Sequence, residues 1–224
     1  MQIKDVPERL QPRERHTNGR ADTPRGEVAA VVLAGGASKR MGETNKLLAK
    51  IDGGSLVRRV TEAVVASRAA EVIVVTGHEA HHVHNALSGL DIRFVHNPHY
   101  PDGHSTSLHA GIGAVAEKYS GAVVLLGDMP RVTVNVVDAL IERFHEKHDS
   151  VICQPNFGGR PGNPVLWPRE FFPDILEISG DTGARHLLKR FADRVSGVEV
   201  AESGILLDID TPGDLEALKS AGEV

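Results

Sequence analysis

Short apolar runs alternate with amphipathic segments along most of the chain. Residues 28–34 and 71–76 are nearly continuous runs of small or β-branched apolar residues, which is typical of strands buried on both faces of a parallel sheet. Apolar residues recur at helical spacing over 55–67 and 133–147. The alternation continues with expected strands over 91–95, 150–154 and from Gly121 to Gly127, and expected helices over 79–87 and from Ser105 to about 118. This order predicts a single-domain, doubly wound (Rossmann-like) α/β fold, with a mostly parallel sheet and helices on both faces.

The two ends of the chain differ from this pattern. Residues 1–26 are polar, charged and proline-containing, so we expect a flexible N-terminal extension before a domain over 27–224. Residues 206–210 are expected to end a last strand. Pro212 then lies in the first turn of a final helix, for which Thr211 and Asp214 are candidate caps.

Composition narrows the class of protein. The 224 residues suffice for one α/β domain, and 41% hydrophobic with 25% charged content is ordinary for a globular chain. The net charge of −5 disfavours general binding to nucleic acid or membrane surfaces. Cys153 is the single cysteine, so no internal disulfide can form, and we expect it to be a buried core residue. No apolar run suggests a membrane span or a signal peptide, and we therefore expect a cytoplasmic protein.

The segment after the first strand has the composition of a phosphate-binding loop. Its backbone is given freedom by three glycines, Gly35, Gly36 and Gly42. Its positive charge comes from Lys39, Arg40 and Lys46. An ordinary strand-to-helix turn is the alternative. No Gly-Lys-Ser/Thr follows the glycines, which excludes a P-loop, and the adjacent Gly35 and Gly36 do not fit Gly-x-Gly-x-x-Gly. A dinucleotide-dependent redox fold is therefore disfavoured.

Acidic residues follow two of the expected strands. Asp128 stands at the carboxyl end of a parallel strand, where such folds bind ligands, and its carboxylate suits Mg²⁺. Capping of the next helix is the alternative role. Asp208 and Asp210 alternate along an extended segment, so only one of them can readily face a metal.

Three further segments carry candidate chemistry. Pro98, Pro101 and Gly103 force a loop before Ser105, a candidate N-cap whose helix start offers N–H and hydroxyl groups to a ligand, or is simply capped. Residues 179–186 likewise favour a capped helix that runs to about 190. His78 with His82, or His81 with His84, could share a helical face and bind a metal, although a solvated His-rich surface is the alternative.

Several of these motifs together resemble one enzyme family. The motifs occur in order: Leu33-Ala-Gly-Gly36 with Ser38, Arg40-Met-Gly42 and Lys46; Asn97-Pro98 with Gly103-x-Ser-x-Ser-Leu108; Leu126-Gly-Asp-Met-Pro130; Gly159-x-x-Gly-x-Pro164; Gly180-Asp-x-Gly-Ala-Arg185; and Ile209-Asp-Thr-Pro212. They resemble the nucleotidyltransferases that make nucleotide sugars and molybdopterin dinucleotides, most narrowly the molybdenum cofactor cytidylyltransferases and guanylyltransferases. The resemblance covers about residues 28 to 219. Asn163 departs from it, since many relatives have His there.

The resemblance implies a role for each matched residue. Catalytic roles fall to Arg40, Lys46 and Asp128. Nucleotide binding is implied for Leu33, Ala34, Gly35, Gly36, Ala37, Arg40, Lys46, Gly103, Ser107 and Asp128. Acceptor binding is implied for Gly162, Pro164, Asp181 and Arg185. Asp128 and Asp210 would hold Mg²⁺, with Asp208 as the alternative second ligand.

The implied reaction is transfer of a nucleoside monophosphate, CMP from CTP, to the phosphate of molybdopterin, with release of pyrophosphate. GTP remains an alternative donor, because Leu33-Ala-Gly-Gly36 is the sequence usual in the guanylyltransferase branch. Another phosphorylated acceptor, such as a sugar or alcohol phosphate, and a non-catalytic nucleotide-binding maturation factor are the remaining alternatives. The resemblance also allows a molybdoenzyme or its chaperone as a partner, and suggests neither nucleic acid nor membrane.

Overall fold

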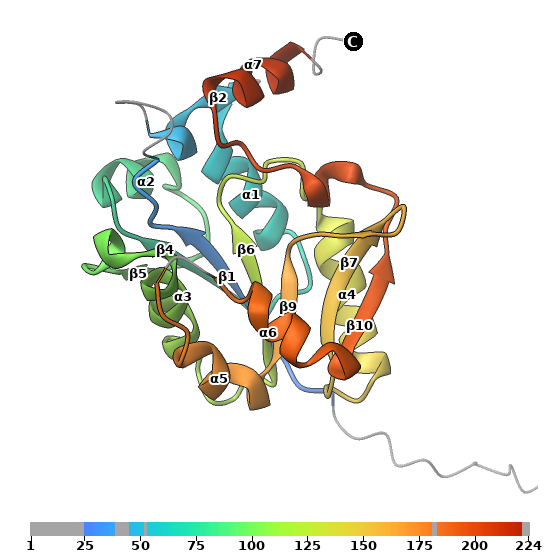
Figure 1. The fold of residues 1–224 in the computed structure, drawn as a ribbon. Coiled ribbons are helices and arrows are strands. Elements are labelled where there is room, and N and C mark those ends of the chain that lie inside the picture. The colour runs from blue at the N-terminus through green and yellow to red at the C-terminus, as the bar shows by residue number, and fades with distance from the viewer. Residues whose placement is uncertain (1–24, 39–44, 52, 181–182, 221–224) are drawn as a thin grey trace, which may run out of the picture.

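Apolar strands form a sheet at the centre of the molecule (Figure 1). The computed structural model describes residues 25–38, 45–51, 53–180 and 183–220. Within these residues an eight-stranded sheet has the order β10-β7-β9-β6-β1-β4-β5, with β8 beside β7. The strands are β1 (Val28–Ala34), β4 (Glu71–Thr76), β5 (Arg93–His96), β6 (Gly121–Leu126), β7 (Ile152–Phe157), β8 (Arg160–Pro161), β9 (Val165–Pro168) and β10 (Val195–Glu199).

The sheet is mostly parallel, as the apolar runs predicted. β1 lies between β4 and β6 and pairs in parallel with both. β9 is the exception in the middle of the sheet, because it runs antiparallel to β6 and to β7. A separate hairpin of β2 (Lys50–Ile51) and β3 (Gly54–Ser55) stands outside the sheet.

Helices cover both faces of the sheet. They are α1 (Leu56–Val65), α2 (Ala80–Ala86), α3 (His104–Gly113), α4 (Val134–Glu146), α5 (Phe172–Leu176), α6 (Arg185–Arg190) and α7 (Pro212–Ser220). Short 3₁₀ helices add η2 (Lys46–Leu48), η3 (Tyr100–Asp102), η4 (Arg169–Phe171), η5 (Ala192–Arg194) and η6 (Ser203–Leu206).

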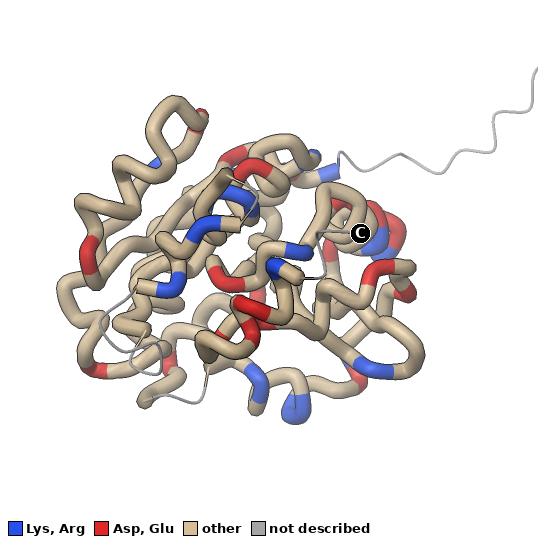
Figure 2. Tube along the Cα trace, turned by 90° about the horizontal axis from the view of Figure 1, so that it is seen from above, with Lys and Arg blue, Asp and Glu red and all other residues tan. Residues whose placement is uncertain are grey.

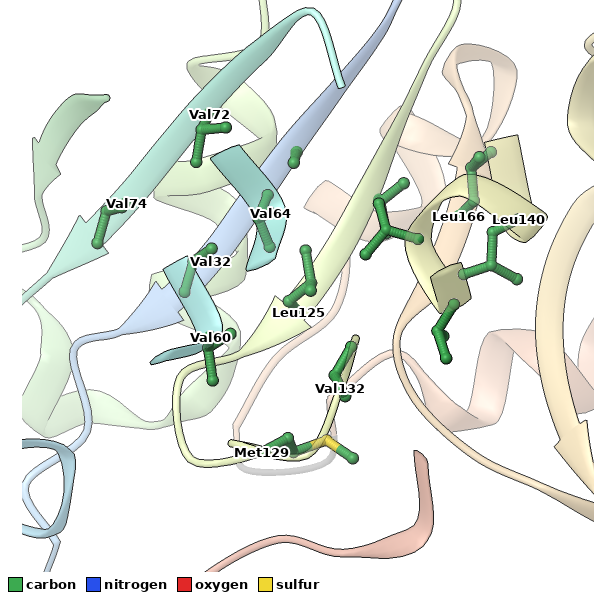
Figure 3. Close-up of a cluster of buried hydrophobic side chains, with 14 of the residues drawn as sticks. Val32, Val60, Val64, Val72, Val74, Leu125, Met129, Val132, Leu140 and Leu166 are labelled. Atoms are coloured by element: carbon green, nitrogen blue, oxygen red, sulfur yellow. The ribbon is translucent and has the colours of Figure 1, made fainter. Parts of the chain in front are cut away.

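Alternation along β1 divides the core into two layers. Ala30 and Val32 face one layer, where α1, α2 and α4 pack, and Ala29 and Val31 face the other, where α3, α5 and α6 pack. Figure 3 shows part of the first layer, in which side chains of α1, β1, β4 and β6 meet. Trp167, fully buried, is the largest side chain in the second layer.

A third, smaller cluster holds the end of the chain. Ile51, Leu56, Ile209 and Leu218 are buried together, and they join the β2–β3 hairpin, α1 and α7. Figure 1 accordingly shows α7 beside β2, at the top of the view. These contacts position both Lys46, which precedes β2, and Asp210, which precedes α7.

Several local expectations were confirmed and others were wrong. The strands over 28–34 and 71–76 have the predicted limits, and Cys153 is buried, which raises the pKa of its thiol to about 12. Ser105 is not the N-cap of α3, since the helix begins at His104 and Gly103 caps it. Ser55 stands at the N-cap of α1, but its side chain makes no capping hydrogen bond.

The end of α3 was also predicted wrongly. The helix stops at Gly113 instead of near residue 118. Arg169 explains part of this difference, because its guanidinium donates to the carbonyls of Ala116 and Tyr119, the latter at 2.6 Å. Residues 206–210 do not form a strand either, since η6 ends at Leu206 and the chain then runs extended into α7.

Other expectations concern features that the described residues show only in part. The proposed extension, residues 1–26, falls almost wholly outside the described residues, which begin at 25. No helix in the described ranges is long and apolar enough to cross a membrane. In the same ranges no three His, Cys, Asp or Glu side chains gather as a metal site, and His84 instead stacks on Phe94, with ring centroids 3.9 Å apart.

The α3–sheet contact supplies a stability prediction. A methyl group on Gly111 would overlap Val31 and lie 3.0 Å from Val75, so Gly111→Ala should lower the free energy of unfolding by about 1–3 kcal/mol. Gly113→Ala is the matched control on the same helix, because nothing lies within 4 Å of the added carbon. Urea unfolding measures both. Equal stability of the two variants would contradict this packing.

Candidate functional site

The topological switch point of the sheet, where doubly wound folds form a ligand crevice, lies between β1 and β6. These strands are paired in register, with Leu33 opposite Leu126. After β1 the chain continues to β4 on one side of the pair, and after β6 it continues to β7 and β9 on the other side. The loops that follow the two strands therefore separate. Ligands bind at such a switch point in open α/β sheets.

Lys46 enters this crevice from the loop that follows β1. Ser38, at a left-handed φ of 50°, accepts a hydrogen bond through Oγ from the Lys46 N–H at 3.2 Å. Asn45 is buried, and its Oδ1 accepts from the Leu47 N–H at 3.1 Å. These bonds fix the two ends of the loop and the start of η2. Lys39, Arg40 and Gly42 belong to residues 39–44, which lie outside the described residues.

Asp128 comes to the same crevice from the end of β6. The Gly127 N–H donates to the Leu33 carbonyl at 3.0 Å, which ties this turn to the end of β1. The Asp128 carbonyl accepts from the Ile209 N–H at 3.1 Å. The backbone on either side of the Asp128 side chain is therefore held by two other segments of the site.

Asp210 approaches from the opposite side, just before α7. Its backbone is held by Asp214, whose Oδ2 accepts from the N–H groups of Asp210 and Thr211 at 3.2 and 2.8 Å and from Thr211 Oγ1 at 2.7 Å. The Asp214 N–H donates in return to Thr211 Oγ1, so the predicted cap is present. Asp208 is exposed, and it is Asp210 that faces Lys46.

These three side chains form a compact ionic cluster. Lys46 Nζ lies 2.5 Å from Asp128 Oδ2 and 2.8 Å from Asp210 Oδ1. Burial alone would lower the pKa of Lys46, but attraction and hydrogen bonds from Asp128 and then Asp210 outweigh it and raise that pKa. Lys46 is therefore a cation at neutral pH. In the view from this end of the molecule, acidic and basic positions are mixed along the trace (Figure 2).

The cluster fits a divalent metal. It carries one positive and two negative charges, and both carboxylates are directed at one point. Asp128 Oδ1 is also buried and has no hydrogen-bond partner among the described residues. Mg²⁺ usually takes one or two carboxylates and completes its shell with water and substrate phosphates. Two acids and an unsatisfied oxygen match that donor set.

Gly35 packs against Ser107, which belongs to a second group of polar side chains, at the start of α3. Buried Asn97 donates through Nδ2 to Ser107 Oγ at 3.0 Å and to Thr106 Oγ1 at 2.9 Å. A methyl group on Gly35 would lie only 2.8 Å from Ser107 Oγ. Glycine is needed here because Ser107 fills the space that a side chain would take.

The α3 N-terminus also contacts the segment expected to bind the acceptor. Gly103 has φ 123° and ψ 168°, a conformation that favours glycine. The Ser105 N–H donates to the Gly180 carbonyl at 3.2 Å, which joins the 179–186 segment to the helix start. Arg185 begins α6 and is exposed, while Asp181 lies outside the described residues.

The other matched residues are placed as follows. Leu33 and Ala34 end β1, Gly36 is exposed in the loop, and Ala37 is half-buried beside it. Gly162 and Pro164 are buried, and a methyl on Gly162 would overlap the Ile205 carbonyl. Packing against Ile205 therefore accounts for that glycine without a ligand. The nucleotide, acceptor and metal roles of all these residues stay predictions.

Three residues that organise the site were not given a role in it by sequence reasoning. Asn97, Asn45 and Asp214 are polar groups that hold backbone or neighbouring hydroxyls. Asn97 was part of a quoted motif, and Asp214 was considered only as a helix cap. Asn45 had no recognisable signal, because its function depends on Ser38 and Leu47 in the folded loop.

Comparison with known proteins agrees with this geometry. Residues 30–195 match the family model described as MobA-like NTP transferase domain. The chain is 28% identical to the molybdenum cofactor cytidylyltransferase of Escherichia coli K12, over 86% of this chain and 95% of that protein. It is 32% identical to a probable molybdenum cofactor guanylyltransferase of Thermococcus sibiricus, over 88% of this chain and 100% of that protein.

A solved structure shows the same fold. A nucleotidyl transferase from Methanothermobacter superposes with a TM-score of 0.76 at 25% identity, covering 87% of this chain and 97% of that chain. The family match spans well over half of the chain and includes most of β1, Lys46, β6 and Asp128. The chain belongs to the MobA-like NTP transferase family.

Proposed function

We propose that this chain transfers CMP from CTP to the terminal phosphate of molybdopterin and releases pyrophosphate. The observation that carries the proposal is the convergence of Lys46, Asp128 and Asp210 at the β1–β6 switch point. The Gly103-to-Leu108 helix start and the 180–185 motif support cytidylyl transfer to a pterin. The similarity to the Escherichia coli cytidylyltransferase supports the same choice.

The reaction needs positioning and charge neutralisation more than a covalent group on the protein. An acceptor phosphate oxygen attacks the α-phosphorus of CTP in line, the α–β bridging bond breaks, and pyrophosphate leaves with the bridging oxygen. The acceptor phosphate is already ionised, so no general base is required. Lys46 would neutralise charge on the triphosphate, with backbone N–H groups of residues 35–37 as additional donors.

Asp128 and Asp210 are the residues that would hold Mg²⁺. When bound, this ion would supply charge neutralisation between the donor and acceptor phosphates. Asp214 would keep Asp210 in place through the backbone bonds described above. Cytoplasmic location and a molybdoenzyme recipient belong to this proposal as well.

The packing of Gly35 weakens one argument for GTP. The Gly-Gly sequence at 35–36 is the one usual in guanylyltransferases. It would favour GTP if the absence of a side chain at residue 35 left room for a purine. Here that room is taken by Ser107 Oγ, 2.8 Å from where a methyl would lie. Guanylyl transfer is kept as the second candidate, because the Thermococcus relative bears that name.

The first test is release of pyrophosphate from each of the four NTPs, with Mg²⁺ and molybdopterin. We expect CTP to be preferred by at least about tenfold over GTP. Asp128→Asn should lower the rate by about 10²–10³, since a preorganised charged group is lost. Release from GTP alone would establish guanylyl transfer instead. CTP binding without pyrophosphate release, with sugar and alcohol phosphates also tried, would indicate a maturation factor.

The Gly35–Ser107 contact gives a second prediction. Gly35→Ala should raise the Kd for CTP about tenfold, because the methyl displaces Ser107 and breaks its bond with Asn97. Removing the hydroxyl in a Gly35→Ala/Ser107→Ala double variant should recover part of the loss, so the two effects will not add. Equilibrium dialysis with labelled CTP measures all three variants. Additive losses would show that residue 35 acts independently of Ser107.

Asp214 is a positioning residue, and its effect should fall on the metal. Asp214→Ala should raise the Mg²⁺ concentration for half-maximal activity about 10–100-fold, as is usual when a group that orients a metal ligand is lost. Asp214→Asn keeps an acceptor oxygen and should lose less. Asp208→Ala, an exposed aspartate two residues before Asp210, is the matched control and should behave as wild type. The reverse order of the two alanine variants would assign the metal to Asp208.

A further inference from the structure

The ammonium of Lys46 takes the position at which both acids of the site converge. It is within 2.5 Å of Asp128 Oδ2 and 2.8 Å of Asp210 Oδ1, and only 15% of the side chain is exposed. A cation that bound the same two oxygens would meet this ammonium at contact distance. Two cations cannot share one pair of carboxylates in a half-buried site without strong repulsion.

The main chain of Lys46 is fixed but its side chain can reach elsewhere. The N–H is bound by Ser38, and the next residue, Leu47, is buried in the core layer of α1 and α4. The four-carbon stem of a lysine carries a compact charge that is not tied to one geometry, unlike the planar fork of arginine. A triphosphate in the adjoining loop would offer that charge an alternative set of oxygens.

The backbone of each acid is held independently of the lysine. Asp128 is bonded through its carbonyl to Ile209, and Asp210 through its N–H to Asp214. Asp128 Oδ1 makes no hydrogen bond within the described chain, so Lys46 engages only one of its two oxygens. The backbone that carries each carboxylate would therefore keep its place if the ammonium moved away.

We propose that Lys46 is an internal counter-ion that keeps the divalent-metal site closed until a nucleotide arrives. In the nucleotide-free chain the ammonium offsets part of the charge of Asp128 and Asp210, and the metal competes with it and binds weakly. The triphosphate draws the ammonium away, and the metal then enters with or after the nucleotide. This ordering rests on the proposed function, which assigns the two acids to the metal.

The test is binding of Mn²⁺, a spectroscopically visible substitute for Mg²⁺, to the protein without nucleotide. Lys46→Met should bind Mn²⁺ at least about tenfold more tightly than wild type, because a competing cation is removed from two carboxylates. Lys46→Arg keeps the charge and should bind as weakly as wild type. Lys118→Met is the matched control, since Lys118 pairs with Glu27 at 3.6 Å on the exposed surface. Electron paramagnetic resonance of free Mn²⁺ and calorimetry measure the affinities, and circular dichroism checks the fold.

Each outcome decides the proposal. Unchanged Mn²⁺ affinity in folded Lys46→Met would overturn it, as would an equal gain in affinity in Lys46→Arg, which keeps the charge. If Lys46→Met does not fold, Lys46→Gln replaces it in the same comparison.

A separate variant keeps the two proposals distinguishable. Asp128→Asn should weaken Mn²⁺ binding in the presence of CTP, after correction for Mn²⁺ held by CTP in solution. If it does so while Lys46→Met shows no gain, the metal site stands and the counter-ion role fails. If Asp128→Asn has no effect, the assignment of the metal ligands in the proposed function fails.

Discussion

The site depends on one constraint of the sheet: β1 and β6 are neighbours in register, but their chains must leave in opposite directions. Doubly wound folds form their ligand crevice at such a switch point, and here the Gly127 N–H donates to the Leu33 carbonyl beside it. A short loop from each strand then suffices to bring a cation and an acid together. Lys46 and Asp128 would not meet if the two strands were not neighbours in the sheet.

The second acid, Asp210, is held at the site by a different kind of contact. Asp210 belongs to no strand, and its position depends on the small core of Ile51, Leu56, Ile209 and Leu218 and on the cap formed with Asp214. Buried side chains hold the segment on one side of Asp210, and hydrogen bonds hold its backbone on the other. The candidate site is thus built from a sheet edge and the separately anchored helix α7.

Sequence reasoning succeeded where local pattern decides structure. The continuous apolar runs of β1 and β4 are buried on both faces, and their limits coincide with those predicted. It failed where distant residues decide. Arg169 donates to carbonyls of residues that follow Gly113, where α3 ends, and no residue near α3 in the sequence indicates this contact. The same holds for Ser107, whose hydroxyl explains Gly35 only once the loop and the helix are folded together.

The family match ends at residue 195, before both Asp210 and the helix that anchors it. A fragment cut to those limits would retain the glycine-rich loop, Lys46 and Asp128. It would lose Ile209 and Leu218 from the core cluster, together with one of the two carboxylates on Lys46. Trimming the protein at the conventional family boundary would therefore leave Lys46 with a single acidic partner and remove one of the two acids that we propose for the metal, which makes Ile209, Asp210 and α7 part of the working unit.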